Sequence, residues 1–138
     1  MKNINIIIKG NPLAKQSARF SKRGFSYQPK HITQYKENLQ HQIISQLPFG
    51  FTPIDNAVEI EYRFIFSYLK THSKKKRADG YIMKTTKPDI DNLQKAVNDA
   101  MNSIVIIDDS LICRAIVEKV YGEVPSIELT IRSIEWSI

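Results

Sequence analysis

Five aspartates and one lysine between residues 89 and 109 have a spacing that suits the cleavage of phosphodiesters. Asp89 and Asp91 are separated by one residue, Lys95 follows about one helical turn later, and Asp108 and Asp109 form an adjacent pair. A hard divalent cation such as Mg²⁺ takes oxygen ligands, and it can activate a water molecule and neutralise a phosphate. A nearby lysine can stabilise the charge that develops in the transition state. If the two groups of aspartates converge in the fold, they indicate a metal-dependent hydrolase of phosphodiesters.

Each of these residues also has a purely structural interpretation, which the residues alone leave open. Asp89 could cap a helix N-terminus, and Asp91 could favour the positive end of the helix dipole. Asp91 and Lys95 could form a surface pair one turn apart, and Asp108–Asp109 could lie in a solvated turn. The combination favours a cation, because the repulsion within a group of carboxylates is relieved when a metal ion binds.

A helix over residues 89–102 is expected to position the first group of aspartates. Projected at about 100° per residue, the apolar side chains fall on one side, namely Leu93, Ala96, Val97 and Ala100, flanked by Ile90 and Met101. The polar side chains fall on the other side, namely Asp91, Lys95, Asn98 and Asn102. Pro88 suits the first turn, so the helix should begin there.

The rest of the pattern predicts one domain over residues 1–138, of the α/β (α+β) class, with a small mixed sheet and two main helices in the order β-α-β-α-β-β. A buried first strand over 4–10 should end at Gly10, and a helix should run from an N-cap at Thr33 to Leu47. An alternating strand is expected over 57–68, and two strands over 111–122 and 126–136 should form a hairpin. Residues 21–24 suit a hairpin tip, and residues 70–87 suit a basic loop.

Positive charge is concentrated before the aspartates. Residues 1–88 contain 16 Lys and Arg against 5 Asp and Glu, whereas residues 89–138 contain 4 against 9. One interpretation is a polyanion-binding surface around an acidic cation site, and the alternative is two differently solvated faces. The single cysteine, Cys113, excludes an internal disulfide and fits a reducing, cytoplasmic location. The sequence contains no glycine-rich phosphate loop, so no nucleotide cofactor is expected. The N-terminal apolar run is too short for a membrane span.

The runs KPDIDNLQKAVNDAMN and IDDSLI resemble the signature of RusA-type Holliday junction resolvases, crossover-junction endodeoxyribonucleases often carried by prophages. The signature has Asp-x-Asp-Asn, a Lys four residues after the second Asp, an Asp four further on and a later acidic pair. Its counterparts here are Asp89-Ile90-Asp91-Asn92, Lys95, Asp99 and Asp108-Asp109. The stretch GNPLAKQSARFSKRGFSYQPKHITQYKENL resembles the phage branch, except that Ser17 stands where many such sequences have a basic residue. The likeness covers nearly the whole chain.

The resemblance implies a role for each matching residue. Mg²⁺, with Mn²⁺ as a substitute, would be bound by Asp89, Asp91 and Asp109, and Lys95 would be the catalytic lysine. Asp108 would assist or stand outside the ligand shell, and Asn92 and Asp99 would hold the helix in place. The implied phosphate contacts are Lys15, Arg19, Lys22, Arg23, Lys84 and Lys87. Residues 74–77 would either reach junction arms or form a solvated loop, and Phe25 and Tyr27 would either stack on bases or pack beneath the hairpin.

The implied protein is a homodimeric, Mg²⁺-dependent endodeoxyribonuclease that resolves four-way junctions by paired symmetric nicks in DNA recombination and repair. Two symmetry-related sites suit a two-fold-symmetric junction. Two alternatives stay open: a related nuclease that prefers flaps or forks, and a DNA-binding protein that does not cut. The intact Asp89, Asp91, Lys95 and Asp109 argue against the last one, because carboxylates that face phosphates do not help a protein that only binds.

Overall fold

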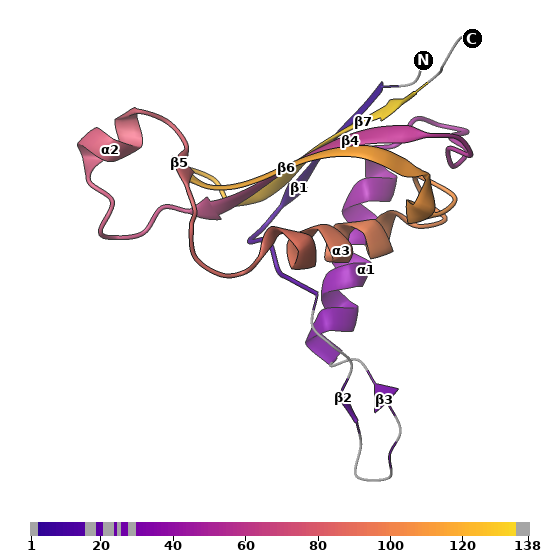
Figure 1. Ribbon diagram of the computed structural model, residues 1–138, viewed down its shortest axis with the longest axis horizontal. Coiled ribbons are helices and arrows are strands. Elements are labelled where there is room, and N and C mark those ends of the chain that lie inside the picture. The colour runs from indigo at the N-terminus through magenta and orange to yellow at the C-terminus, as the bar shows by residue number, and fades with distance from the viewer. Residues whose placement is uncertain (1–2, 16–18, 21–23, 25, 28–29, 135–138) are drawn as a thin grey trace.

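A computed structural model of the chain describes residues 3–15, 19–20, 24, 26–27 and 30–134 (Figure 1). Within these residues, five strands form one mixed sheet: β1 (Asn3–Lys9), β4 (Val58–Ser67), β5 (Ile82–Met83), β6 (Ile112–Gly122) and β7 (Ser126–Ser133). Their order is β1-β7-β4-β6-β5, with β4 and β6 parallel and the other neighbours antiparallel. Two short strands, β2 (Arg19–Phe20) and β3 (Ser26–Tyr27), pair separately. The expected mixed α+β class is confirmed.

Two helices, α1 (Lys30–Ser45) and α3 (Ile90–Met101), pack on the same face of the sheet (Figure 1). The alternating apolar residues of the strands face them, and the core also contains Leu93 and Val97 of α3. The helix expected over 89–102 is thus confirmed, with Asp89 and Asn102 as its flanking cap residues. The predicted start at Pro88 is wrong, because Asp89 still has an extended backbone and the helix begins at Ile90. None of the helices in the described ranges is long and apolar enough to cross a membrane.

The start of α1 differs from expectation. The helix begins at Lys30, so the predicted N-cap at Thr33 is wrong and Thr33 lies inside the first turns. The apolar spacing explains the difference, because Ile32 and Tyr35 extend the half-buried side of the helix toward its N-terminus, ahead of the buried Leu39 and Ile43.

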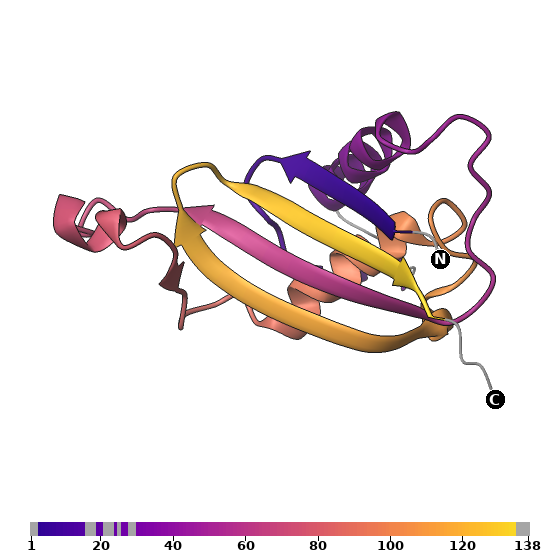
Figure 2. The same ribbon diagram turned by 90° about the horizontal axis from the view of Figure 1, so that it is seen from above.

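The predicted hairpin between the last two strands is also wrong. β7 does not pair with β6 but lies between β1 and β4, as Figure 2 shows. The link from Gly122 to Ser126 therefore passes over the end of β4, where Tyr68 N donates to Gly122 O at 3.2 Å. A Cβ at Gly122 would stand 2.7 Å from Ile65 Cγ2, so only glycine fits this close crossing.

The basic stretch expected as a loop contains the short helix α2 (Lys74–Ala78) and the strand β5. We call residues 68–81 the basic projection, because α2 extends beyond the edge of the sheet in Figures 1 and 2. The Arg77 guanidinium donates to the carbonyls of Leu69 and His72 at 2.9 and 3.0 Å, and the Tyr68 hydroxyl donates to Gly80 O at 2.7 Å. These bonds give the segment a defined shape, so the expectation of a plain loop is wrong.

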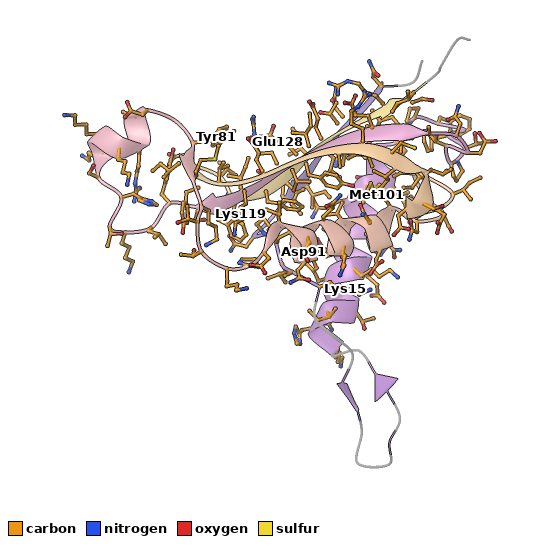
Figure 3. The ribbon with its side chains drawn as sticks, in the orientation of Figure 1. Lys15, Tyr81, Asp91, Met101, Lys119 and Glu128 are labelled. Atoms are coloured by element: carbon orange, nitrogen blue, oxygen red, sulfur yellow. The ribbon has the colours of Figure 1, made fainter. Side chains whose placement is uncertain are left out.

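The other face of the sheet carries charged side chains instead of helices. Arg63 lies between Glu118 and Glu128, and Arg132 lies 3.6 Å from Glu59 and 3.3 Å from Glu61. Figure 3 shows Glu128 and Tyr81 on this side, opposite Asp91 and Met101 of α3. The charged face is therefore separated from the aspartates of α3 by the full thickness of the sheet.

Candidate active site

Asp89 stands at the N-cap position of α3 with an extended backbone, but its side chain makes no capping hydrogen bond. Instead, Asp89 Oδ2 lies 2.9 Å from Lys87 Nζ, and these side chains are 50% and 84% exposed. An exposed pair of this kind contributes only about 0.2–1 kcal/mol. Asp89 is therefore the N-cap residue of α3, as its structural interpretation had it, but its side chain does not cap the helix. Among the described residues its carboxylate pairs with Lys87, in a contact that a divalent cation can displace.

Asp91 and Lys95 lie on the exposed side of α3, opposite the buried Leu93 and Val97. No ion pair joins Asp91 to Lys95 in the part of the chain that the structure describes. The interpretation of Asp91 and Lys95 as a surface ion pair is therefore wrong. Both side chains stand at the surface within the first two turns of one helix, where they can meet a ligand.

Asp108 and Asp109 differ in whether the side chain caps a helix. Asp108 Oδ2 accepts a hydrogen bond from Ser110 N at 3.0 Å, which caps the short helix η1 (Asp109–Leu111). Hydrogen bonding to the Ser110 side chain, and then to its backbone, lowers the pKa of Asp108. Asp109 makes no such cap and lines a groove with Gln94 and Asn98 of α3. Asp109 is therefore the member of the pair that faces the helix of Asp91.

A buried tyrosine binds Asn98, one of the residues that line this groove. Tyr62 of β4 is 1% exposed, and its hydroxyl donates to Asn98 Oδ1 at 2.6 Å. Burial, with a smaller effect from the Asp109 charge, raises the pKa of Tyr62 to about 12. The hydroxyl stays protonated at neutral pH, so it can hold the Asn98 amide in one orientation beside Asp109.

The donor atoms around α3 fit a hydrated hard cation but not a closed ligand cage. Within the described residues, no three His, Cys, Asp or Glu side chains lie close enough together to hold a metal ion, so the predicted ligands Asp89, Asp91 and Asp109 are not brought together as a set of three. The oxygen donors that line the groove are those of Gln94, Asn98 and Asp109, and Cys113 and Arg114 line it as well. Asp91 is not in this lining and stands on the same helix, in the turn before Gln94. Mg²⁺ suits such a site, because it keeps several waters and is commonly held by one or two carboxylates together with substrate phosphates.

The predicted phosphate contacts have different surroundings. Lys22 and Arg23 lie outside the described residues, as do Ser17 and Phe25, and of Arg19 only the backbone is described. Lys15 Nζ lies 2.5 Å from Asp99 Oδ2, and Lys15 N donates to Asn92 O at 3.0 Å, so this segment is joined to α3 twice. The expected supporting role of Asp99 has a physical basis in its contact with Lys15, whereas the bond at Asn92 is made by the backbone carbonyl and does not depend on the asparagine side chain.

The two other lysines also have partners. Lys84 Nζ lies 4.9 Å from the ring centres of Phe66 and Tyr121 and donates to Thr86 Oγ1 at 2.9 Å. Lys87, by contrast, has the exposed Asp89 as its one partner among the residues that the structure describes. Of the predicted phosphate contacts with a described side chain, Lys87 is therefore the most available.

Lys119 of β6 was not among the residues predicted from the sequence. Its Nζ donates to the carbonyls of Thr86 and Pro88 at 2.5 and 2.7 Å, directly before Asp89. One signal was present: Lys119 occupies a strand position whose neighbours two residues away, Val117 and Tyr121, are apolar. A charged residue in such an alternating row indicates a specific polar partner on the helix side.

The chain is similar to known proteins over most of its length. The family model described as endodeoxyribonuclease RusA matches residues 9–132. The uncharacterized protein YqaN of Bacillus subtilis (strain 168) is 36% identical over 83 residues, which are 59% of this chain and 58% of that protein. The match thus spans less than two thirds of that relative. On the family match, which covers nearly the whole length, the chain belongs to the endodeoxyribonuclease RusA family.

Proposed function

We propose that this protein is a Mg²⁺-dependent endodeoxyribonuclease that resolves four-way DNA junctions by paired symmetric nicks, in recombination and repair. One observation carries the proposal. Asp89 and Asp109 each stand at or beside a helix start without capping it, whereas the neighbouring Asp108 does cap. Exposed carboxylates that cap no helix, on a chain of net charge +6, are explained best by a cation and an anionic substrate.

The proposed reaction is hydrolysis of one phosphodiester per site. A P–O bond forms to the oxygen of water, and the P–O bond to one deoxyribose oxygen breaks. When bound, the cation supplies charge neutralisation at the phosphate and activation of the water. Asp89, Asp91 and Asp109 are its proposed ligands, with Mn²⁺ as a substitute for Mg²⁺. Lys95 is proposed to stabilise the negative charge that builds up on the phosphate oxygens.

DNA is proposed to lie along the basic residues that surround this groove. Lys87 is the foremost candidate, because a cation bound at Asp89 would release its ammonium for a phosphate. The basic projection is a second candidate contact. Its exposed lysines 70, 74, 75 and 76 form no ion pair with any described carboxylate, while Arg77 is used internally. Lys15, Arg19, Lys22, Arg23 and Lys84 complete the proposed set.

A homodimer is proposed because a four-way junction has two equivalent strands to cut. The charged face of the sheet is the proposed contact, since it carries no helix and exposes Ile7 and Ile116 by 56% and 53%. Light scattering tests this contact. Ile116→Glu should yield monomers, whereas Ile44→Glu, at a 54% exposed position of α1, should leave the dimer intact.

The test of the function is a cleavage assay on synthetic DNAs of matched sequence, namely a four-way junction, a flap, a fork and a linear duplex. Cutting of the junction by paired nicks, with Mg²⁺ and not in a chelator, is the expected result. Preferred cutting of the flap or fork would assign a related nuclease, and binding without cutting in Mg²⁺ or Mn²⁺ would refute the enzyme.

A further inference from the structure

The ammonium of Lys119 lies between the sheet and the loop that leads into α3. Lys119 is on β6, and its partly buried side chain points to the side of the sheet on which α3 lies. Figure 3 labels it close to the N-terminal end of α3, near Asp91. Nζ donates to Thr86 O at 2.5 Å and to Pro88 O at 2.7 Å.

The same residue also binds the loop through its backbone. Lys84 N donates to Lys119 O at 3.1 Å, so three hydrogen bonds from one strand residue span the loop between Lys84 and Pro88. The next residue is Asp89, whose side chain makes no bond to the helix that follows it. The backbone carbonyl of Asp89 accepts a hydrogen bond from Leu93 N at 3.2 Å, so Asp89 is held by α3 on one side and by the loop that Lys119 binds on the other.

We propose that Lys119 is a positioning residue of the active site, which fixes Asp89 by binding the carbonyls of Thr86 and Pro88. The inference rests on the proposed function, in which Asp89 is a metal ligand. Lys119 itself is not a ligand, because an ammonium has no lone pair to offer. Its contribution is to hold one carboxylate where the cation can meet it.

Two physical effects of Lys119 on metal binding have opposite signs. Through space, an ammonium repels a divalent cation, so removal of its charge alone would strengthen metal binding. Through the loop, the ammonium orients a ligand, and loss of such a supporting bond typically weakens metal binding by about 10–100-fold. The sign of the change therefore separates the positioning role from a mere effect of charge.

The experiment measures Mn²⁺ binding to the full chain without DNA, by the loss of the electron paramagnetic resonance signal of free Mn²⁺. Lys119→Met should bind Mn²⁺ about 10–100-fold more weakly than wild type. Lys119→Arg, which keeps a cationic donor, should recover most of the affinity. Lys36→Met, at an exposed position of α1, removes the same charge and should leave the affinity unchanged.

A double-mutant cycle tests whether Lys119 acts through Asp89. In an Asp89→Asn background, Lys119→Met should have little further effect, because the ligand that it positions is already lost. An equal loss in both backgrounds would overturn the inference, and so would unchanged or tighter binding by Lys119→Met. Thermal unfolding is recorded for each variant, and Lys119→Gln is measured instead if Lys119→Met does not fold.

The failure of this inference differs from the failure of the proposed function. If the wild-type protein binds no Mn²⁺, the proposed metal site is contradicted, and so is the positioning role of Lys119. Wild type that binds Mn²⁺ normally, together with a Lys119→Met chain that binds equally well, contradicts the positioning role alone.

Discussion

Lys95→Ala should separate catalysis from folding more cleanly than any other change in α3. Lys95 is exposed and forms no ion pair among the described residues, so its removal should change the free energy of unfolding by less than about 0.5 kcal/mol. If its ammonium stabilises the transition state, the cleavage rate should fall about 10²–10³-fold, or roughly 2.7–4 kcal/mol. The loss of rate would thus be far larger than the loss of stability.

A matched change on the opposite side of the same helix should give the reverse pattern. Leu93 is 0% exposed, and Leu93→Ala should cost about 2–5 kcal/mol of stability through lost burial and a cavity. While folded, the Leu93→Ala protein should cut nearer the wild-type rate than the Lys95→Ala protein. The two variants therefore test whether α3 has one structural and one chemical side.

The assay is single-turnover cleavage of a labelled four-way junction in Mg²⁺, with junction binding measured separately in a chelator and unfolding followed in urea. Lys95→Arg should restore little activity, because a planar guanidinium does not replace a compact ammonium. A Lys95→Ala protein that cuts within about threefold of wild type would refute the role of Lys95, since the expected loss is at least about 10². A large loss of stability in the same variant would refute its assignment to the exposed side.

Four further results are expected. Asp91→Asn should abolish cutting in Mg²⁺ while junction binding stays equal or tightens, and normal cutting would contradict the ligand assignment. Lys87→Ala should make the salt slope of junction binding shallower by about 0.9, the value for one phosphate contact on a duplex arm, and an unchanged slope would argue against that contact. Burial and the neighbouring basic side chains lower the pKa of His72, so the unfolded chain takes up its proton first and the free energy of unfolding should decrease as pH falls below about 6.5. The His72→Phe variant should lose this part of the pH dependence in urea unfolding. A pH profile identical to that of the wild type would contradict the role of His72. Gly122→Ala should destabilise the protein by about 1–3 kcal/mol in the same measurement, because its Cβ would stand 2.7 Å from Ile65 Cγ2.

The sequence by itself determined the elements whose side chains repeat with a clear period. The stripe of Leu93, Val97 and Ala100 located α3 to within a residue, because a helix must bury its apolar side wherever it is docked. The alternation of β4 likewise identified a strand with one buried face. The candidate ligands of α3 could be named in advance for the same reason, since their spacing is a property of the helix itself.

Only the tertiary structure decided which strands are neighbours and which polar groups meet. A short link from Gly122 to Ser126 favours a hairpin locally, yet β7 pairs with β1 and β4, because pairing is decided by long-range burial and not by the link. The contact of Lys119 with Pro88 O joins residues 31 apart in the chain, and no period in the sequence specifies it. The aspartates could thus be predicted from local spacing. The groups that bind the segments around them could not, because the sheet brings those groups together from distant parts of the chain.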